Sequence, residues 1–303
     1  MTEPVIMIGL GEVLWDLLPA GKVLGGAPSN FAYMASVLGD QGIVASRVGN
    51  DVLGREACCV MQELGLSTAY LQHDERHETG TATVSIDAAG QPNFTIKKPV
   101  AWDFLEWSTQ WEQLAARADV VCFGSLAQRS EKSAATIERF LQNTSRNALR
   151  ICDVNLRESF YSQSVLRRSF QHADILKLND QELLQVSYLF HLGIGTQEVL
   201  ARRLLRLCDL QLVSITRGSR GSLLITEREV VEHEGLRVRV ADAVGAGDAF
   251  TACLAHHYVR GHSLQEISES ANRFASWVAT QTGATPLITS EKLQSILNGV
   301  AQR

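Results

Sequence analysis

Several classes of protein are excluded by what this sequence of 303 residues lacks. It has no excess of positive charge: 28 Lys and Arg face 33 Asp and Glu, and the net charge of −5 argues against a nucleic acid or a membrane surface as partner. No apolar run approaches the roughly 18 residues of a membrane span. The N-terminal segment carries neither a basic cluster nor a long apolar stretch, so we expect no signal peptide and a cytoplasmic protein.

Cysteine pairs are also missing. The six cysteines include no C-x-x-C motif, and several of them lie in apolar runs. We therefore expect buried thiols in a reducing compartment, and neither disulfides nor a cysteine-bound zinc. Internal repeats, low-complexity tracts and a linker rich in Pro or Ser are absent as well, although the length alone would allow one or two domains.

The most informative stretch runs from Asp242 to Phe250 and has the sequence DAVGAGDAF. Gly245 and Gly247 flank the small residue Ala246, and an apolar run of helical length follows. A tight turn that opens a helix presents free N–H groups and the positive end of the helix dipole, and glycines let an anion come close. Asp248 would be repelled there unless it has a role, such as general base for a hydroxyl that attacks a phosphoryl group. The alternative is a glycine turn in which Asp248 caps the helix.

The second half of the chain alternates short apolar strands with helices from residue 118 onward. This rhythm predicts a parallel sheet that is covered by helices on both faces. Ligands bind such sheets at the carboxyl ends of the strands, where polar clusters lie in this sequence. These clusters are Asp153-Asn155-Arg157, Asn179 with Glu182, Thr216-Arg217-Gly218, and Asp242 with Asp248.

A second glycine pair lies near the N-terminus, in the string GGAPSN at residues 25–30. Gly25 and Gly26 would let a small polar ligand approach the backbone, and Asn30 can both donate and accept hydrogen bonds. The alternative is a plain loop that begins a helix. The earlier string GLG is no dinucleotide motif, because Leu14 stands where the third glycine is required, and this disfavours an NAD-dependent oxidoreductase.

Alternating residues at 81–86, a turn at 88–90 and a return strand at 93–97 predict a β-hairpin. Lys97 at its end either reaches into the site or is a solvated charge on a strand edge. Asn179 and Glu182, three residues apart, are either an N-cap with its capping-box partner or a functional pair.

Three strings together resemble the ribokinase/PfkB family of carbohydrate kinases: DAVGAGD, GGAPSN and RVGNDVLG at residues 47–54. The likeness runs from Gly9 to Pro286, and the N-terminal string looks most like the fructokinase branch. One departure is Ala243, where the family usually has Thr. The resemblance implies a single ribokinase-like α/β domain over 1–303, with a mostly parallel central sheet, helices on both faces, and a small β lid formed from about 12–25 and 79–103.

The resemblance implies an ATP-dependent kinase that phosphorylates a primary hydroxyl of a small sugar, with fructose preferred. The alternatives in the same family are 2-keto-3-deoxygluconate, ribose or a nucleoside as substrate. The alternative of another class is a catalytically silent subunit that binds sugar or nucleotide. Relatives often dimerise through the lid, so a homodimer is expected.

The resemblance also implies roles for single residues. The transfer centre would comprise Asp248 as base, the anion hole at Gly245, Ala246 and Gly247, and Arg157. The sugar would be held by Asp16, Gly25, Gly26 and Asn30, with Lys97 as the further candidate from the hairpin. The nucleotide would meet Asn179, Thr216, Arg217, Gly218, Gly221 and Asn272.

Two cations follow from the same resemblance. Mg²⁺ would be organised by Glu182, largely through water, and one carboxylate suffices because Mg²⁺ keeps several waters. A monovalent cation such as K⁺ would be held by Asp242 and by backbone carbonyls near Val244 and Gly283. The family often has a hydroxyl four residues after that glycine, where this chain has Leu287.

Overall fold

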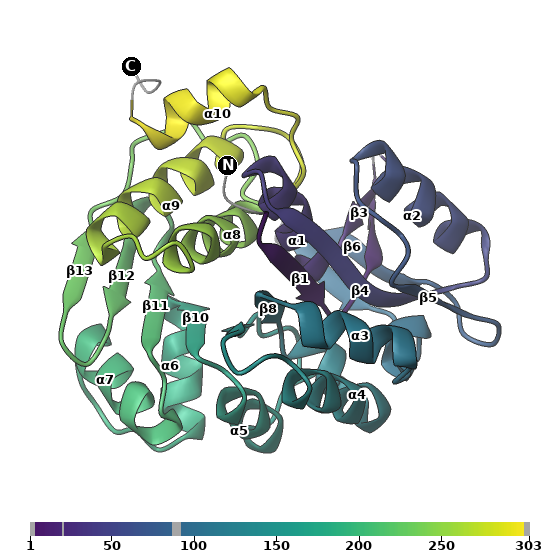
Figure 1. Cartoon of the computed structure of the whole chain (residues 1–303), viewed down its shortest axis with the longest axis horizontal. Coiled ribbons are helices and arrows are strands. Elements are labelled where there is room, and N and C mark those ends of the chain that lie inside the picture. The colour runs from purple at the N-terminus through teal and green to yellow at the C-terminus, as the bar shows by residue number, and fades with distance from the viewer. Residues whose placement is uncertain (1–3, 20, 87–91, 300–303) are drawn as a thin grey trace.

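The computed structural model describes residues 4–19, 21–86 and 92–299. Its largest element is a nine-stranded sheet in the order β13-β12-β11-β10-β9-β8-β1-β4-β5 (Figure 1). Every neighbouring pair is parallel except β11–β12 and β12–β13, which are antiparallel. The strands are β1 (Ile6–Leu10), β4 (Gln41–Gly49), β5 (Leu71–Asp74), β8 (Val120–Phe123), β9 (Leu149–Asp153), β10 (Ile175–Asn179), β11 (Leu212–Thr216), β12 (Ser222–Ile225) and β13 (Val230–His233).

Helices cover both faces of this sheet, because its strands are apolar on both sides; all four residues of β8, for example, are buried. One face packs against α1 (Ala27–Val37), α2 (Val52–Glu63), α8 (Ala246–Tyr258), α9 (Leu264–Ala279) and α10 (Ser290–Leu297). The other packs against α3 (Thr109–Arg117), α4 (Glu131–Gln142), α5 (Gln163–Gln171), α6 (Asp180–Leu189) and α7 (Gln197–Cys208). Figure 1 shows α8 to α10 towards the top and α3 to α7 towards the bottom. The predicted layers are confirmed.

A separate four-stranded sheet forms the lid, in the order β3-β2-β6-β7. Its strands are β2 (Leu14–Leu18), β3 (Gly21–Gly25), β6 (Gly80–Ile86) and β7 (Pro92–Ile96). Both hairpins are antiparallel, whereas β2 and β6 run parallel and join the two predicted segments into one sheet. The turn expected at 88–90 lies outside the described residues.

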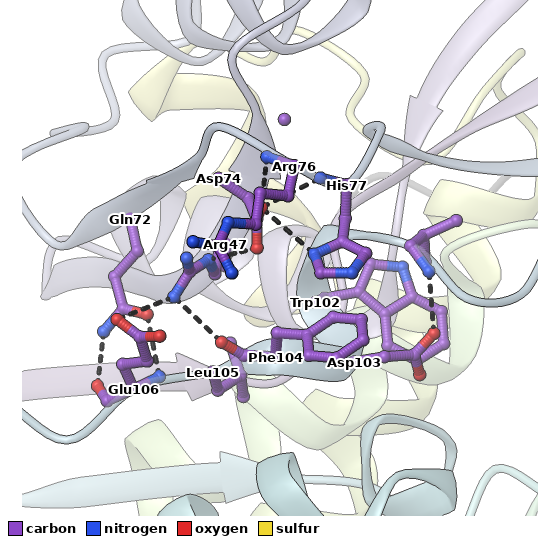
Figure 2. Close-up of polar contacts among 12 residues, drawn as sticks. Arg47, Gln72, Asp74, Arg76, His77, Trp102, Asp103, Phe104, Leu105 and Glu106 are labelled. Atoms are coloured by element: carbon purple, nitrogen blue, oxygen red, sulfur yellow. Dashed lines mark hydrogen bonds and ion pairs between the residues drawn. The ribbon is translucent and has the colours of Figure 1, made fainter.

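A polar cluster joins β4 and β5, at one edge of the large sheet, to the segment that follows the lid strand β7. Figure 2 shows Arg47 between Asp74 and the backbone of Phe104, with distances of 2.9 Å to each, while His77 stacks on the Phe104 ring at 3.6 Å between centroids. Asp74 accepts from the backbone N–H groups of Arg76 and His77. Burial opposes ionisation of Asp74, but these hydrogen bonds outweigh it and lower its pKa. These contacts therefore hold the segment around Phe104, which follows the lid, against the edge of the large sheet.

The RVGNDVLG string has a structural role at the same place. Asp51 caps α2 by accepting from the N–H of Gly54, and its carboxylate also accepts from the N–H and hydroxyl of Thr79 at 2.8 and 2.7 Å. The Thr79 hydroxyl in turn accepts from the N–H of Gly49. This string therefore ties the start of β6 to the large sheet.

The long helix α9 covers Leu264–Ala279. It begins after Ser263, whose hydroxyl accepts from the N–H of Glu266 in a capping box. It ends at Ala279, because the carbonyl of Ala279 accepts from Ala241 and Asp242 and the N–H of Gly283 donates to Asp242 instead of to the helix. None of the helices in the described part of the chain is long and apolar enough to cross a membrane.

Candidate active site

A cavity of about 810 Å³ lies where the large sheet, the lid and the start of α8 meet. It opens at the carboxyl ends of β1, β9, β10 and β11, where polar residues were predicted to converge. Eleven of the predicted site residues line it: Asp16, Gly26, Asn30, Arg157, Asn179, Glu182, Thr216, Val244, Gly245, Gly247 and Asp248. The structure thus brings together residues from both ends of the chain.

The turn before α8 has the predicted form. Gly245 is the N-cap with φ of 79°, a left-handed conformation that favours glycine. A Cβ there would lie 2.6 Å from the Cα of Ala284, so the close approach of that loop also requires glycine. The N–H of Ala246 donates to the Ala243 carbonyl at 3.3 Å, whereas the next N–H groups of α8 have no carbonyl one turn earlier, and Gly245 and Gly247 line the cavity. An anion would be stabilised at this point.

Asp248 lies in the first turn of α8, partly buried, and accepts from the Asn30 amide at 2.8 Å. Burial raises its pKa to about 6, and the nearby charge of Asp153 adds to this effect. The Asn30 hydrogen bond and the charges of Lys177 and Arg157 act in the opposite direction. A carboxyl group with this pKa is ionised at neutral pH and is basic enough to accept a proton from a hydroxyl.

A buried ion pair lies next to the turn before α8. The Lys177 ammonium lies 3.0 Å from both oxygens of Asp153, and both side chains are almost fully buried, at 9% and 6% exposed. The hydroxyl of Thr251 in α8 donates to Asp153 at 3.0 Å. Burial opposes the charged form of Lys177, but Asp153, Glu182 and Asp248 outweigh it and raise its pKa, so the side chain is an ammonium at neutral pH. It lies 3.1 Å from where a Cβ of Gly247 would be, and therefore adds positive charge to the anion site.

Asn179 and Glu182 form the capping box that was one of the two predicted alternatives. The Asn179 side chain accepts from the N–H groups of Gln181 and Glu182, and Glu182 accepts from the N–H of Asn179 at 2.8 Å. The second oxygen of Glu182 accepts from the N–H of Leu156 at 3.0 Å. Each oxygen of Glu182 thus accepts one backbone hydrogen bond and keeps a lone pair to which a water molecule bound to Mg²⁺ could donate.

The lid end of the cavity is built on the glycine pair. A Cβ on Gly25 would lie 2.5 Å from a carboxylate oxygen of Asp16, and one on Gly26 would lie 2.5 Å from the carbonyl of Glu12. The pair therefore lets Asp16 and the first turn of α1 lie close together. Burial raises the pKa of Asp16, while the charge of Arg157 lowers it.

Glu12 is a site residue that the sequence reasoning missed. It lines the cavity, is only 2% exposed, and its Oε2 has no hydrogen-bond partner within the described part of the chain. Burial raises its pKa to about 7, against the effect of a backbone hydrogen bond and of Arg157. In the same cavity, Oδ1 of Asn30 is also buried without a partner. Two residues that line the cavity thus each hold a buried acceptor atom without a partner, which a ligand with hydroxyl groups could supply.

Lys177 was missed as well, although the sequence held a signal for it. It stands in the otherwise apolar strand ILKL, and a charged residue is buried in such a strand only with a partner. Asp153 was singled out in its cluster, but its pairing with Lys177 across neighbouring strands was not.

Nine predicted residues lie outside the lining of the cavity, and the side chains of three of them have other partners. Lys97 is half-exposed and forms an ion pair with Glu78. Asn272 is buried between α9 and β12, where it donates to the Ser222 hydroxyl and the Ser268 carbonyl, both at 2.7 Å. Arg217 pairs with Glu232 at 2.7 Å and donates to the His233 carbonyl, so it braces the β12–β13 hairpin.

The remaining predicted residues form the backbone around the site. Gly218 and Gly221 have φ of 58° and 76° in the turn between β11 and β12. The two oxygens of Asp242 accept from the N–H groups of Val244 and Gly283, at 3.0 and 3.2 Å. This carboxylate therefore joins the turn before α8 to the loop after α9.

Comparison with known proteins agrees with this geometry. The family model for pfkB family carbohydrate kinases matches residues 20–291. A fructokinase from Vibrio alginolyticus is 28% identical over 301 residues, which cover 93% of this chain and 96% of that protein.

Two solved structures resemble this one along their whole length. The fructokinase from Xylella fastidiosa with bound ATP has a TM-score of 0.85 at 20% identity, covering 100% of both chains. The 2-dehydro-3-deoxygluconokinase from Thermotoga maritima has a TM-score of 0.82 at 18% identity, covering 99% of both chains. These TM-scores show that the fold is shared, and the predicted ribokinase-like fold is confirmed. Because the family model spans most of the sequence, this chain belongs to the pfkB family of carbohydrate kinases.

Proposed function

We propose that this chain transfers the γ-phosphoryl group of ATP to a primary hydroxyl of a neutral sugar, with fructose as the preferred substrate. The observation that carries the proposal is Asp248, a carboxylate with a raised pKa beside a helix N-terminus that favours an anion. A base and an anion site in contact are what phosphoryl transfer to a hydroxyl requires. Fructose is supported by the fructokinase relative from Vibrio alginolyticus.

The mechanism follows from the positions of these groups. Asp248 takes the proton of the sugar hydroxyl, the sugar oxygen bonds to the γ-phosphorus, and the bond to the β-phosphate oxygen breaks to leave ADP. Asn30 orients Asp248 through its hydrogen bond of 2.8 Å. The N–H groups of the turn at Gly245, Ala246 and Gly247, together with the Lys177 ammonium, stabilise the charge on the phosphoryl oxygens.

Metal ions and the nucleotide fit the donor groups present. Mg²⁺ near Glu182 would neutralise the charge on the nucleotide phosphates. For K⁺, the donor set would be Asp242 with the carbonyls of Val244 and Gly283. For ATP, the proposed contacts are Asn179, Thr216, Arg217, Gly218, Gly221 and Asn272. The side chains of Arg217 and Asn272 would contact it only by leaving Glu232 and Ser222.

The charges at the lid end of the cavity favour a neutral sugar over a sugar acid. Three carboxyl groups line this end, those of Glu12, Asp16 and Glu158, and one cationic side chain, Arg157, accompanies them. The carboxylate of 2-keto-3-deoxygluconate would meet more like charge than opposite charge and would lose its hydration without a cationic partner. Sugar hydroxyls, in contrast, can donate to all three carboxyl groups.

We expect Glu12→Gln to lower kcat/KM for the sugar by about tenfold or more, because a hydrogen bond to a charged acceptor is lost. The pH profile gives a second readout. The pKa of Glu12 is raised to about 7, so its carboxylate is lost as the pH falls through 7, and wild-type kcat/KM should fall there before Asp248 titrates near 6.

The pH profile of wild-type kcat/KM thus has two falling limbs, one near pH 7 and one near pH 6. In Glu12→Gln the limb near pH 7 should vanish and the limb near pH 6 should remain. Glu63→Gln, an exposed site at the end of α2, is the matched control and should keep both limbs. Because Glu12 and Asp248 influence each other's pKa, the two apparent pKa values of the wild-type profile describe the pair together. The variant then assigns one of them to each residue. An unchanged profile and KM in Glu12→Gln would remove Glu12 from the site.

The experiment that tests the proposal is ADP release from Mg-ATP with a panel of fructose, 2-keto-3-deoxygluconate, ribose and a nucleoside, each with and without K⁺. Turnover on fructose is expected, and dependence on K⁺ would support the cation site despite the exposed Leu287. Turnover on another member would keep the mechanism and overturn the choice of sugar. No turnover, with ATP still bound, would favour the silent subunit.

The expected homodimer through the lid stays a prediction. Leu18 and Val23 lie on the lid strands β2 and β3 and are each 40% exposed. Apolar side chains of this kind would be covered in such a dimer. Lys97, on the same lid, would contact the sugar only by leaving Glu78.

A further inference from the structure

A second groove lies apart from the active site, between the segment at 237–239, the end of α9 and the start of α10. Its volume is about 690 Å³. It shares no lining residue with the active-site cavity. The lining residues are Arg237, Val238, Arg239, Trp277, Thr280, Gln281, Leu287, Ile288, Thr289 and Lys292.

The groove is cationic in a protein that is acidic overall. Arg237, Arg239 and Lys292 line it, and its lining contains neither Asp nor Glu. All three side chains are exposed, and among the described residues no carboxylate lies within ion-pair distance of any of them. Thr289 in the groove is the N-cap of α10, but Glu291 in the same first turn offsets the positive end of the helix dipole, so the positive charge of the groove comes from its three cationic side chains. Three cations of like sign in one groove attract an anion.

The floor of the groove is apolar and includes an aromatic ring. Trp277 is partly buried, and its ring lies parallel to that of Phe274 with 6.2 Å between centroids, which limits its movement. Val238 and Ile288 flank it, and Leu287 is 83% exposed. A ligand that fits has a multiply charged group for the cations and a body that covers the indole. From these features we propose that the groove binds an organic phosphate.

The groove is connected to the active site through the backbone. Thr280 and Gln281 in its wall lie three and two residues before Gly283, whose N–H donates to Asp242 at the turn before α8. The same loop then brings Ala284 against Gly245, the N-cap of the anion site. Its next segment is held by Tyr33 of α1, which donates to the Pro286 carbonyl at 2.9 Å. A ligand in the groove therefore acts on the loop that supports the anion site, and its binding changes the rate of phosphoryl transfer.

The test measures binding first, by the fluorescence change of the full-length protein on titration with AMP, glucose 6-phosphate and inorganic phosphate. KCl at equal ionic strength controls for screening. We expect saturable binding of AMP or glucose 6-phosphate, and the stronger of the two identifies a nucleotide or a sugar phosphate as the source. In R237Q/R239Q/K292Q the affinity should fall about tenfold or more. In Trp277→Phe the fluorescence change should be lost.

Activity gives the second measurement. The triple variant should turn over as the wild type does when no phosphate ester is added, because none of its three residues lines the active site. The ester should change the wild-type rate, with the substrates saturating, and leave the variant's rate unaltered. Equal affinity in wild type and variant would place the ester in the active site and overturn the proposal, as would a response that KCl reproduces. The binding measurement stands whether or not fructose is the substrate.

Discussion

Asp248→Asn is expected to lower kcat by about 10²–10⁴-fold, the usual contribution of a general base. The amide keeps the size of the side chain but cannot accept the proton of the sugar hydroxyl. ATP binding should change little, because the N–H groups of the turn and the Lys177 ammonium remain. The measurement is single-turnover phosphoryl transfer together with the Kd of ATP.

The same variant should not lose stability. Burial raises the pKa of Asp248 from 3.8 to about 6, so the unfolded chain ionises more readily and the folded state is penalised as the pH rises from about 4 to 6 and beyond. Removing the charge removes that penalty, and Tm at pH 7.5 should stay equal or rise. Asp209→Asn, an exposed site in a left-handed turn that Asn tolerates, is the matched control and should keep full activity. Near-normal turnover in Asp248→Asn would refute the base assignment.

Lys177→Met is expected to lower the free energy of unfolding by about 3–5 kcal/mol, because it leaves the buried Asp153 carboxylate without its partner. The thioether fills much of the same space, so the loss comes from the uncompensated charge. Urea denaturation at pH 7.5 measures it. Activity should fall too, because the positive charge beneath Gly247 is gone.

Two further variants separate charge from packing. Asp153→Asn in the Lys177→Met background removes the unpaired carboxylate and should recover part of the stability. Lys132→Met breaks an exposed pair with Glu106 and should cost about 1 kcal/mol or less. If Lys177→Met costs no more than Lys132→Met, the pair does not hold the site together.

The parts of the site that are local in sequence could be predicted from the sequence. The glycines of DAVGAGD indicate a turn before a helix because glycine permits positive φ, and Gly245 adopts it. The alternating strands and helices indicate polar residues at one edge of a parallel sheet, where the cavity lies.

Contacts between distant segments were beyond prediction. The hydrogen bond from Asn30 to Asp248 joins residues that are 218 positions apart, and spacing holds no information about it. Glu12 could not be recognised as a buried acid, because its burial, and hence its raised pKa, depends on contacts between distant segments. The nearby partners of Lys97 and Asn272 could not be foreseen for the same reason: Glu78 and Ser222 become neighbours only in the folded chain.

Asn179 and Glu182 show why two interpretations need not exclude each other. The capping box is formed, and the same two side chains line the cavity. Both oxygens of Glu182 are held by backbone N–H groups, so its charge is fixed in position without direct contact to a ligand. A cap of this kind therefore also holds a charged side chain in a fixed position.

The central claim is that the cavity accepts a neutral sugar whose hydroxyl is deprotonated by Asp248. The most direct test is a competition in which fructose and 2-keto-3-deoxygluconate, at equal concentration, are offered with limiting Mg-ATP and the products are identified by mass spectrometry. We predict that fructose phosphate dominates, because the lid end presents Glu12, Asp16 and Glu158 against one cation, Arg157. Predominant phosphorylation of the sugar acid would contradict the account of the lid end, and unphosphorylated sugars with ATP intact would contradict the kinase itself.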